Sequence, residues 1–183
     1  AGQLRQFVEF HPDPGVDDLQ KCFDDPATRA LIRTGRTRGI FYIESPAQMR
    51  LNQKAQADTF EEVTLTSSLV RPAGTAYIKT FVERHRAMKA GVRDWEFLHP
   101  SLRPILEESH DVCAFQEHVT RICRRVAGLS FRQADNVRKM MNSLHEGVLS
   151  EQEYHRTARA FMDGCRRTSG LDAAQAAGLW ERV

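Results

Sequence analysis

The sequence lacks the patterns that identify most secreted, membrane-spanning and zinc-dependent proteins. Its four cysteines form no Cys-x-x-Cys pair, so we expect neither a zinc ribbon nor a disulfide framework, and reduced thiols are the simplest interpretation. No apolar run approaches the length of a membrane span, and no signal peptide is visible. We therefore expect a cytoplasmic protein without a membrane partner.

Several common catalytic motifs are also missing. The seven histidines show no His-x-x-x-His or His-Glu-x-x-His spacing, so we expect them at the surface or in the core rather than around a metal ion. Ser67 and Ser68 lack the flanking glycines of a nucleophile elbow, which argues against a hydrolase. No Asp-x-Asp sequence, internal repeat or low-complexity tract is present.

Length and charge leave room for one domain or for a piece of a larger protein. The 183 residues suffice to bury a core. The first residue is Ala1 rather than Met, as expected of a processed product or an excerpt of a longer protein. Because the net charge is only +2, any surface that binds nucleic acid must be local.

The most informative stretch runs from Leu98 to Met141. It contains two segments with apolar residues at helical spacing, which predicts two helices. Gly128 is placed to end the first helix, and Ser130 with Gln133 forms a capping box for the second. The remaining faces are basic: Arg121, Arg124, Arg125, Arg132, Arg138 and Lys139. We interpret this pair as a phosphate-binding element, with a solvated charged face as the alternative.

The rest of the chain is predicted to be mainly helical. Caps and apolar spacing predict helices that start at Asp24–Pro26, at Ser45, at Asp58 or Thr59, at Tyr77, at Ser150 and at Asp172. The run Ile40–Ile43 has high strand propensity. The expected fold class is therefore α+β and predominantly helical, with residues 1–75 containing the strand and residues 76–183 helical.

Four stretches, taken in order, resemble the alpha subunit of bacterial DNA polymerase III, a C-family DNA polymerase. They are DDPATRALIRTGRTRGIFYIESPAQ, DTFEEVTLTSSLVRP, LHPSLRPILEESHDVCAFQEHV and AGLSFRQADNVRKMM. The motif FYIESPA, together with Ser-Ser before the Arg-Pro step, is most similar to the sequences of error-prone or accessory relatives. Four stretches in the same order indicate homology over residues 24–183.

The resemblance implies that residues 1–75 are the end of the palm and residues 76–183 are fingers. In this family the fingers bind the triphosphate of the incoming nucleotide and the primer-template DNA, where cations stabilise the charge that builds on the phosphoryl oxygens. It also implies DNA-directed DNA synthesis in replication or repair, with a polymerase holoenzyme as partner. The nucleotide- or DNA-binding candidates are Arg71, Arg84, Arg138 and Lys139, then Arg124 and Arg125, and Gln116 and Glu117 of the Gln-Glu step.

The chain departs from the family where catalysis is concerned. The family's two metal-binding aspartates lie upstream in the palm, so we expect Mg²⁺ only in the parent enzyme, through carboxylates not present here. Glu83 is the nearest candidate for a third catalytic carboxylate, with a structural ion pair to a neighbouring basic residue as the alternative. The family's Arg-Pro-Gly-Pro is Arg71-Pro72-Ala73-Gly74 here.

Two other functions fit parts of the sequence. A helix-turn-helix regulator would use a recognition helix that starts at Phe131, but it leaves the GIFYIES and Arg-Pro segments without a purpose. A catalytically dead relative would serve as a binding or scaffolding module. In the polymerase interpretation, Glu44 and Glu117 are expected as buried partners of basic residues or as structural hydrogen-bonding groups.

Overall fold

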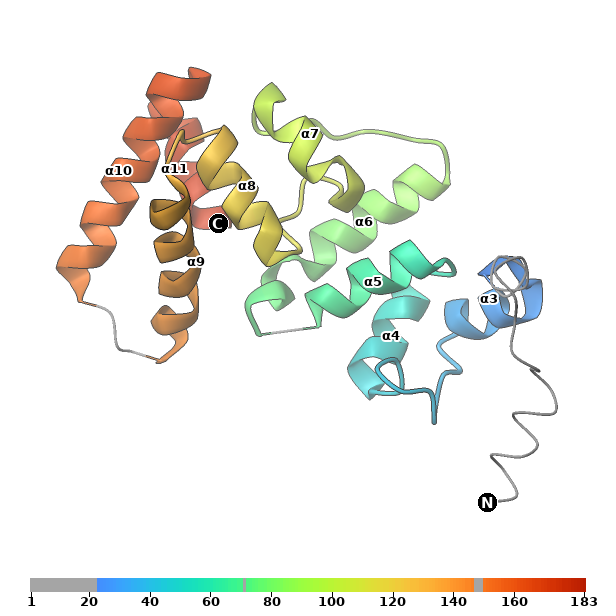
Figure 1. Cartoon of the computed structure of the whole chain (residues 1–183). Helices are drawn as coiled ribbons and strands as arrows, with labels where there is room; N and C mark the ends of the chain where they lie inside the picture. The colour runs from blue at the N-terminus through green and yellow to red at the C-terminus, as the bar shows by residue number, and fades with distance from the viewer. Residues whose placement is uncertain (1–22, 71, 147–149) are drawn as a thin grey trace, which may run out of the picture. The chain divides into compact units, whose positions relative to one another are not determined.

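The computed structural model describes residues 23–70, 72–146 and 150–183 (Figure 1). These residues form helices joined by turns. The α-helices are α3 (Pro26–Arg33), α4 (Pro46–Ala55), α5 (Phe60–Leu69), α6 (Ile78–Lys89), α7 (Arg103–Leu106), α8 (Gln116–Arg125), α9 (Phe131–Glu146), α10 (Glu151–Ser169) and α11 (Ala173–Arg182). Short 3₁₀ segments are Pro72–Tyr77, Pro100–Leu102 and Glu107–Ser109.

The predicted strand Ile40–Ile43 is wrong, and with it the α+β class. The segment forms consecutive turns, in which the amide of Ile40 donates to Thr37 O and the amide of Ile43 donates to Ile40 O. Tyr42 has a φ of 71°, which is incompatible with extended backbone. Strand propensity reflects packing on a pleated, half-buried surface, and the described chain offers this segment no strand to pair with.

The chain divides into two units, residues 1–70 and residues 71–183. In the first, α3, α4 and α5 surround a small core to which Leu51, Leu65 and Leu69 contribute. A buried polar network crosses it, because Gln48 Nε2 and Thr66 Oγ1 donate to Asn52 Oδ1 at 2.9 and 2.7 Å.

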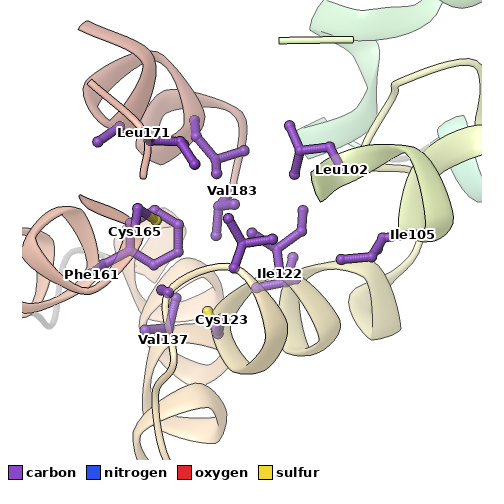
Figure 2. Close-up of a cluster of buried hydrophobic side chains, with 14 of the residues drawn as sticks. Leu102, Ile105, Ile122, Cys123, Val137, Phe161, Cys165, Leu171 and Val183 are labelled. Carbon is purple, nitrogen blue, oxygen red and sulfur yellow. The ribbon is translucent and has the colours of Figure 1, made fainter. Parts of the chain in front are cut away.

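The second unit has its own hydrophobic core, built from α7 to α11 (Figure 2). Ile122, Val137 and Phe161 are fully buried and come from α8, α9 and α10. Cys123 and Cys165 also lie in this core, and burial raises the pKa of each thiol to about 12. The buried thiols are therefore uncharged packing groups at neutral pH.

Most predicted helix starts are confirmed by their capping hydrogen bonds. The side chains of Ser45, Thr59, Ser150 and Asp172 each accept from an amide in the first turn of the following helix. Ser130 Oγ accepts from the amide of Gln133 at 3.3 Å, and the Ser130 amide donates to Gln133 Oε1 at 2.9 Å. The predicted capping box therefore starts α9.

Candidate nucleic-acid interface

Helices α8 and α9 form an antiparallel hairpin closed by Ala127–Ser130 (Figure 1). Gly128 has a φ of 63°, as expected for the predicted left-handed cap, and the amide of Leu129 donates to Cys123 O at 2.9 Å. Val119 of α8 and Ala134 of α9 are buried on the inner faces. The basic residues are thereby directed to the outer faces.

In the middle of α9, Asp135 already neutralises two of the predicted phosphate-binding cations. Its Oδ1 accepts from Arg138 at 2.8 Å and its Oδ2 lies 2.7 Å from Lys139 Nζ. These hydrogen bonds hold the pKa of the Asp135 carboxyl below its ordinary value. Arg138 also donates to Gln116 Oε1 at 3.4 Å, so the hairpin brings two predicted site residues together.

The positive charge at the closed end of the hairpin is less compensated. Arg124 lies over the ring of Phe131, with its guanidinium carbon 5.9 Å from the ring centroid. The side chains of Arg121, Arg125 and Arg132 are exposed, and none has an ion pair with a described residue. This group, Arg121, Arg124, Arg125 and Arg132, is called the closed-end arginines below.

Arg84, another predicted phosphate ligand, contacts His110, Asp111 and Trp95. Its guanidinium donates to the carbonyl of His110 at 2.8 Å, lies 3.4 Å from Asp111 Oδ2 and covers the ring of Trp95. Arg182 of α11 binds the same Asp111 oxygen at 2.8 Å. Arg84 thus joins α6 to the turn before α8.

The remaining candidates are dispersed. Glu83 is exposed on α6 and has no ion pair within the described chain, so its alternative assignment to a structural ion pair finds no support. Glu117 and Glu44 are exposed, which corrects their expected burial. Arg71 lies outside the described residues.

The comparisons with known proteins decide the family. The family model of the bacterial DNA polymerase III alpha subunit finger domain matches residues 6–167. The chain belongs to this finger-domain family. The C-family resemblance is thereby confirmed.

Relatives of this finger domain include a DNA polymerase III subunit alpha and an error-prone DNA polymerase. The DNA polymerase III subunit alpha of Staphylococcus aureus (strain Mu50) is 30% identical over 163 residues, which are 87% of this chain and 14% of that protein. The error-prone DNA polymerase of Symbiobacterium thermophilum is 37% identical over 127 residues, 69% of this chain and 11% of that protein. The chain therefore spans about one-seventh or less of the relatives it matches.

Nothing in the described part of the finger domain fits a magnesium site. No group of three or more His, Cys, Asp or Glu side chains is placed to hold a metal ion there. Glu83 alone cannot hold the paired ions of two-metal catalysis, which need several carboxylates.

Among the described helices, none combines the length and apolar character that a membrane crossing requires.

The sequence predicted this hairpin, and the structure adds which of its cations are paired within it. The spacing of Asp135 to Arg138 and Lys139, three and four residues along a helix, already indicates ion pairs on one face. Arg121 and Arg132 were grouped with the basic face but left out of the binding candidates. The contacts of Arg84 with His110 and Asp111 had no comparable local signal.

Proposed function

We propose that this chain is the finger portion of a DNA-directed DNA polymerase and that its α8–α9 hairpin binds phosphates of primer-template DNA or of the incoming deoxynucleoside triphosphate. The observation that carries the proposal is the unequal compensation of charge on the hairpin. Asp135 neutralises part of the charge in the middle of α9, whereas the closed-end arginines have no carboxylate partner in the described chain. Arginine binds phosphate well because its planar fork reaches two oxygens at once.

The α9 helix supports the same surface. Its N-terminus carries a partial positive charge, and it begins at Phe131, within the group of arginines. The amide of Gln133 is capped by Ser130, so the helix contributes chiefly through its dipole. Phosphate contacts of this kind position DNA without reading its sequence.

The parent enzyme supplies the rest of the proposed activity. Template-directed nucleotidyl transfer with Mg²⁺ needs palm carboxylates that this chain does not contain. In this proposal residues 1–75 lead from the palm into the fingers, and the holoenzyme provides the catalytic site. The finger portion would hold the substrates while the chemistry takes place elsewhere in the protein.

The salt dependence of DNA binding tests the proposal. Binding through phosphates releases counterions, so affinity for primer-template should fall steeply with salt, by a slope of about −0.9 per phosphate neutralised on duplex DNA. Arg124→Ala, Arg125→Ala and Arg132→Ala combined should lower the slope by about two to three units, equally for different sequences. Arg138→Ala with Lys139→Ala should have a smaller effect because Asp135 already holds both cations.

A charge-matched control separates a local surface from net charge. Arg159, Arg166 and Arg167 are exposed on α10, and replacing them with Ala removes the same three charges. Fluorescence anisotropy at several salt concentrations should show a much smaller change for this triple variant. Equal losses in both triple variants, or a flat salt response of the unmodified chain, would leave the scaffolding function. One duplex bound about 1,000-fold more tightly than others would indicate the regulator instead.

A further inference from the structure

The turn segment between α3 and α4 presents two adjacent aromatic rings to solvent. Phe41 and Tyr42 are 83% and 77% exposed, and Ile40 beside them is 46% exposed. The rings form an edge-to-face pair with centroids 4.9 Å apart and an interplanar angle of 89°. Phe41 and Tyr42 are called the aromatic tip below. Figure 1 shows the connection between α3 and α4 as a loop that extends away from these helices.

The aromatic tip sits on an ordered turn. Thr37 is fully buried, and its hydroxyl donates to the carbonyl of Ile43 at 2.6 Å, which ties the two ends of the segment together. Gly39 has a φ of 84° and Tyr42 a φ of 71°. A bulky aromatic residue rarely adopts the left-handed region, and such strained positions cluster at sites of function. The turn therefore holds both rings outward at a conformational cost.

The sequence on both sides of the aromatic tip is rich in arginine. Between residues 33 and 50 the sequence contains Arg33, Arg36, Arg38 and Arg50, with Glu44 as the only acidic residue. Arg33 pairs with Asp58. Arg36, Arg38 and Arg50 are exposed and form no ion pair with any residue that the structure describes.

We propose that the aromatic tip is a stacking site for unpaired bases of a DNA strand, whose phosphates are bound by Arg36, Arg38 and Arg50. Single-strand-binding surfaces combine the same two components, aromatic rings for the bases and cations for the backbone. The surface lies in the first unit and is separate from the α8–α9 hairpin. Only the choice of DNA over RNA rests on the proposed function.

Charge and size favour a nucleic-acid strand over a protein partner. Two rings on a convex turn offer far less apolar area than a stable protein interface buries, which is about 800 Å² per partner. A single base, in contrast, covers one ring face, and every base has such a face. The exposed arginines complement phosphates on either side of a stacked base.

The test uses oligo-dT and a blunt duplex, each bound to the 183-residue chain. Phe41→Ala combined with Tyr42→Gly removes both rings, and glycine adopts the left-handed conformation of Tyr42 without strain. We expect oligo-dT affinity to fall about 5- to 150-fold, the range that the loss of one stacking contact produces. The salt slope and the duplex affinity should stay unchanged, because stacking releases no counterions.

The arginine variants should show the opposite signature. Arg36→Ala with Arg38→Ala should lower the salt slope for oligo-dT by about 1.4 units, at about 0.7 per phosphate of a single strand. Substitutions of the closed-end arginines should instead lower the affinity for the duplex. Failure of this inference and failure of the proposed function are therefore distinguishable.

A control and a spectroscopic signature complete the test. Phe60 is also exposed in the first unit, at 64%, and Phe60→Ala should leave oligo-dT binding unchanged. Phe41→Trp should bind oligo-dT normally and show a change in tryptophan emission that the duplex does not cause. The inference is overturned if the double variant binds oligo-dT within twofold of the unmodified chain, if Phe60→Ala loses as much affinity, or if the new tryptophan does not respond at saturation.

Discussion

The side chain of Asp111 is fully buried and binds arginines from two helices that are distant in the sequence. Arg84 of α6 and Arg182 of α11 both bind its Oδ2, and no described residue donates to its Oδ1. Burial raises the pKa of Asp111 above its ordinary value, and the two arginines offset this effect only in part. The residue therefore provides charged hydrogen bonds while retaining a desolvation cost.

Replacing Asp111 with Ala should destabilise the second unit. The substitution removes both acceptors for the arginines and places Ala at a φ of 62°. Hydrogen bonds to charged groups contribute about 1.5–3 kcal/mol, and we expect a loss of that order in the free energy of unfolding. Chemical denaturation measures it. Asp135→Ala, which removes a partly exposed carboxylate with two cationic partners, is the matched control and should cost much less. Equal losses of unfolding free energy in Asp111→Ala and Asp135→Ala would contradict the claim that burial strengthens the contribution of Asp111.

The raised pKa of Asp111 also predicts a pH dependence. Between the unfolded value of 3.8 and the higher folded value, the folded chain binds more protons than the unfolded chain. Stability from this group is therefore present at low pH and falls as pH rises through the folded pKa. Asp111→Asn cannot titrate, so the unmodified chain should lose stability relative to this variant as pH rises above 3.8. A difference that is constant or increases with pH would contradict the assignment.

At the scale of the elements, caps and close approaches define the α8–α9 hairpin and its contact with α10. Ser130 starts α9, and Ser169 of α10 donates to the carbonyl of Val126 at 2.9 Å. Gly164 of α10 packs directly on the carbonyl of Ala127. The closed end of the hairpin is thus held by local hydrogen bonds and by a neighbouring helix.

Ser130→Ala should lower the free energy of unfolding by about 1 kcal/mol, the usual value of an N-cap side chain. The substitution leaves the amide of Gln133 without its present acceptor. Thr120→Ala is a suitable comparison, because the Thr120 hydroxyl only donates back to Gln116 O within α8, at 3.4 Å. Urea denaturation of both variants would show whether the cap or a general surface effect is responsible. No loss in Ser130→Ala would place the start of α9 elsewhere.

Gly164→Ala should destabilise the chain although alanine favours helices. A Cβ at this position overlaps the carbonyl of Ala127, and overpacking of this kind costs about 1–3 kcal/mol. Gly178 of α11 faces open space, so Gly178→Ala should instead stabilise by about 0.5–1 kcal/mol. Opposite shifts in thermal unfolding are the expected result. Stabilisation by both substitutions would show that α10 does not pack closely on the hairpin.

At the scale of the whole molecule, the chain is a helical finger portion that corresponds to a small part of its relatives. The family match covers residues 6–167, and the residues described contain no carboxylate group suited to paired metal ions. The hairpin and the aromatic tip, in contrast, offer cations and rings for nucleic acid. The proposed division assigns binding to this chain and chemistry to the rest of the polymerase.

The 183-residue chain should therefore not extend primers in the presence of Mg²⁺. The physical reason is the lack of an Asp-x-Asp pair to hold two metal ions near the reacting phosphate. Primer extension with purified protein measures this directly, and a contaminant control from cells without the protein sets the background. Template-directed incorporation above that background would overturn the prediction.

Much of the local structure and the family were predictable from the sequence. The Ser130–Gln133 pair and the left-handed Gly128 are encoded within a few residues of one another, and both are confirmed. The four stretches that occur in the same order as in the C-family polymerases indicated the family. Helix periodicity and capping depend on neighbours along the chain, which is why these predictions succeed.

Only the tertiary structure showed which cations form ion pairs and which backbone conformation Ile40–Ile43 adopts. Asp111 meets Arg84 and Arg182 across separations of 27 and 71 residues, contacts that no local pattern predicts. The apolar run IFYI has the composition of a strand, yet it forms turns because it meets no partner strand among the described residues. The sequence by itself thus determined the helices and the family, whereas packing determined which charges are paired and which remain exposed.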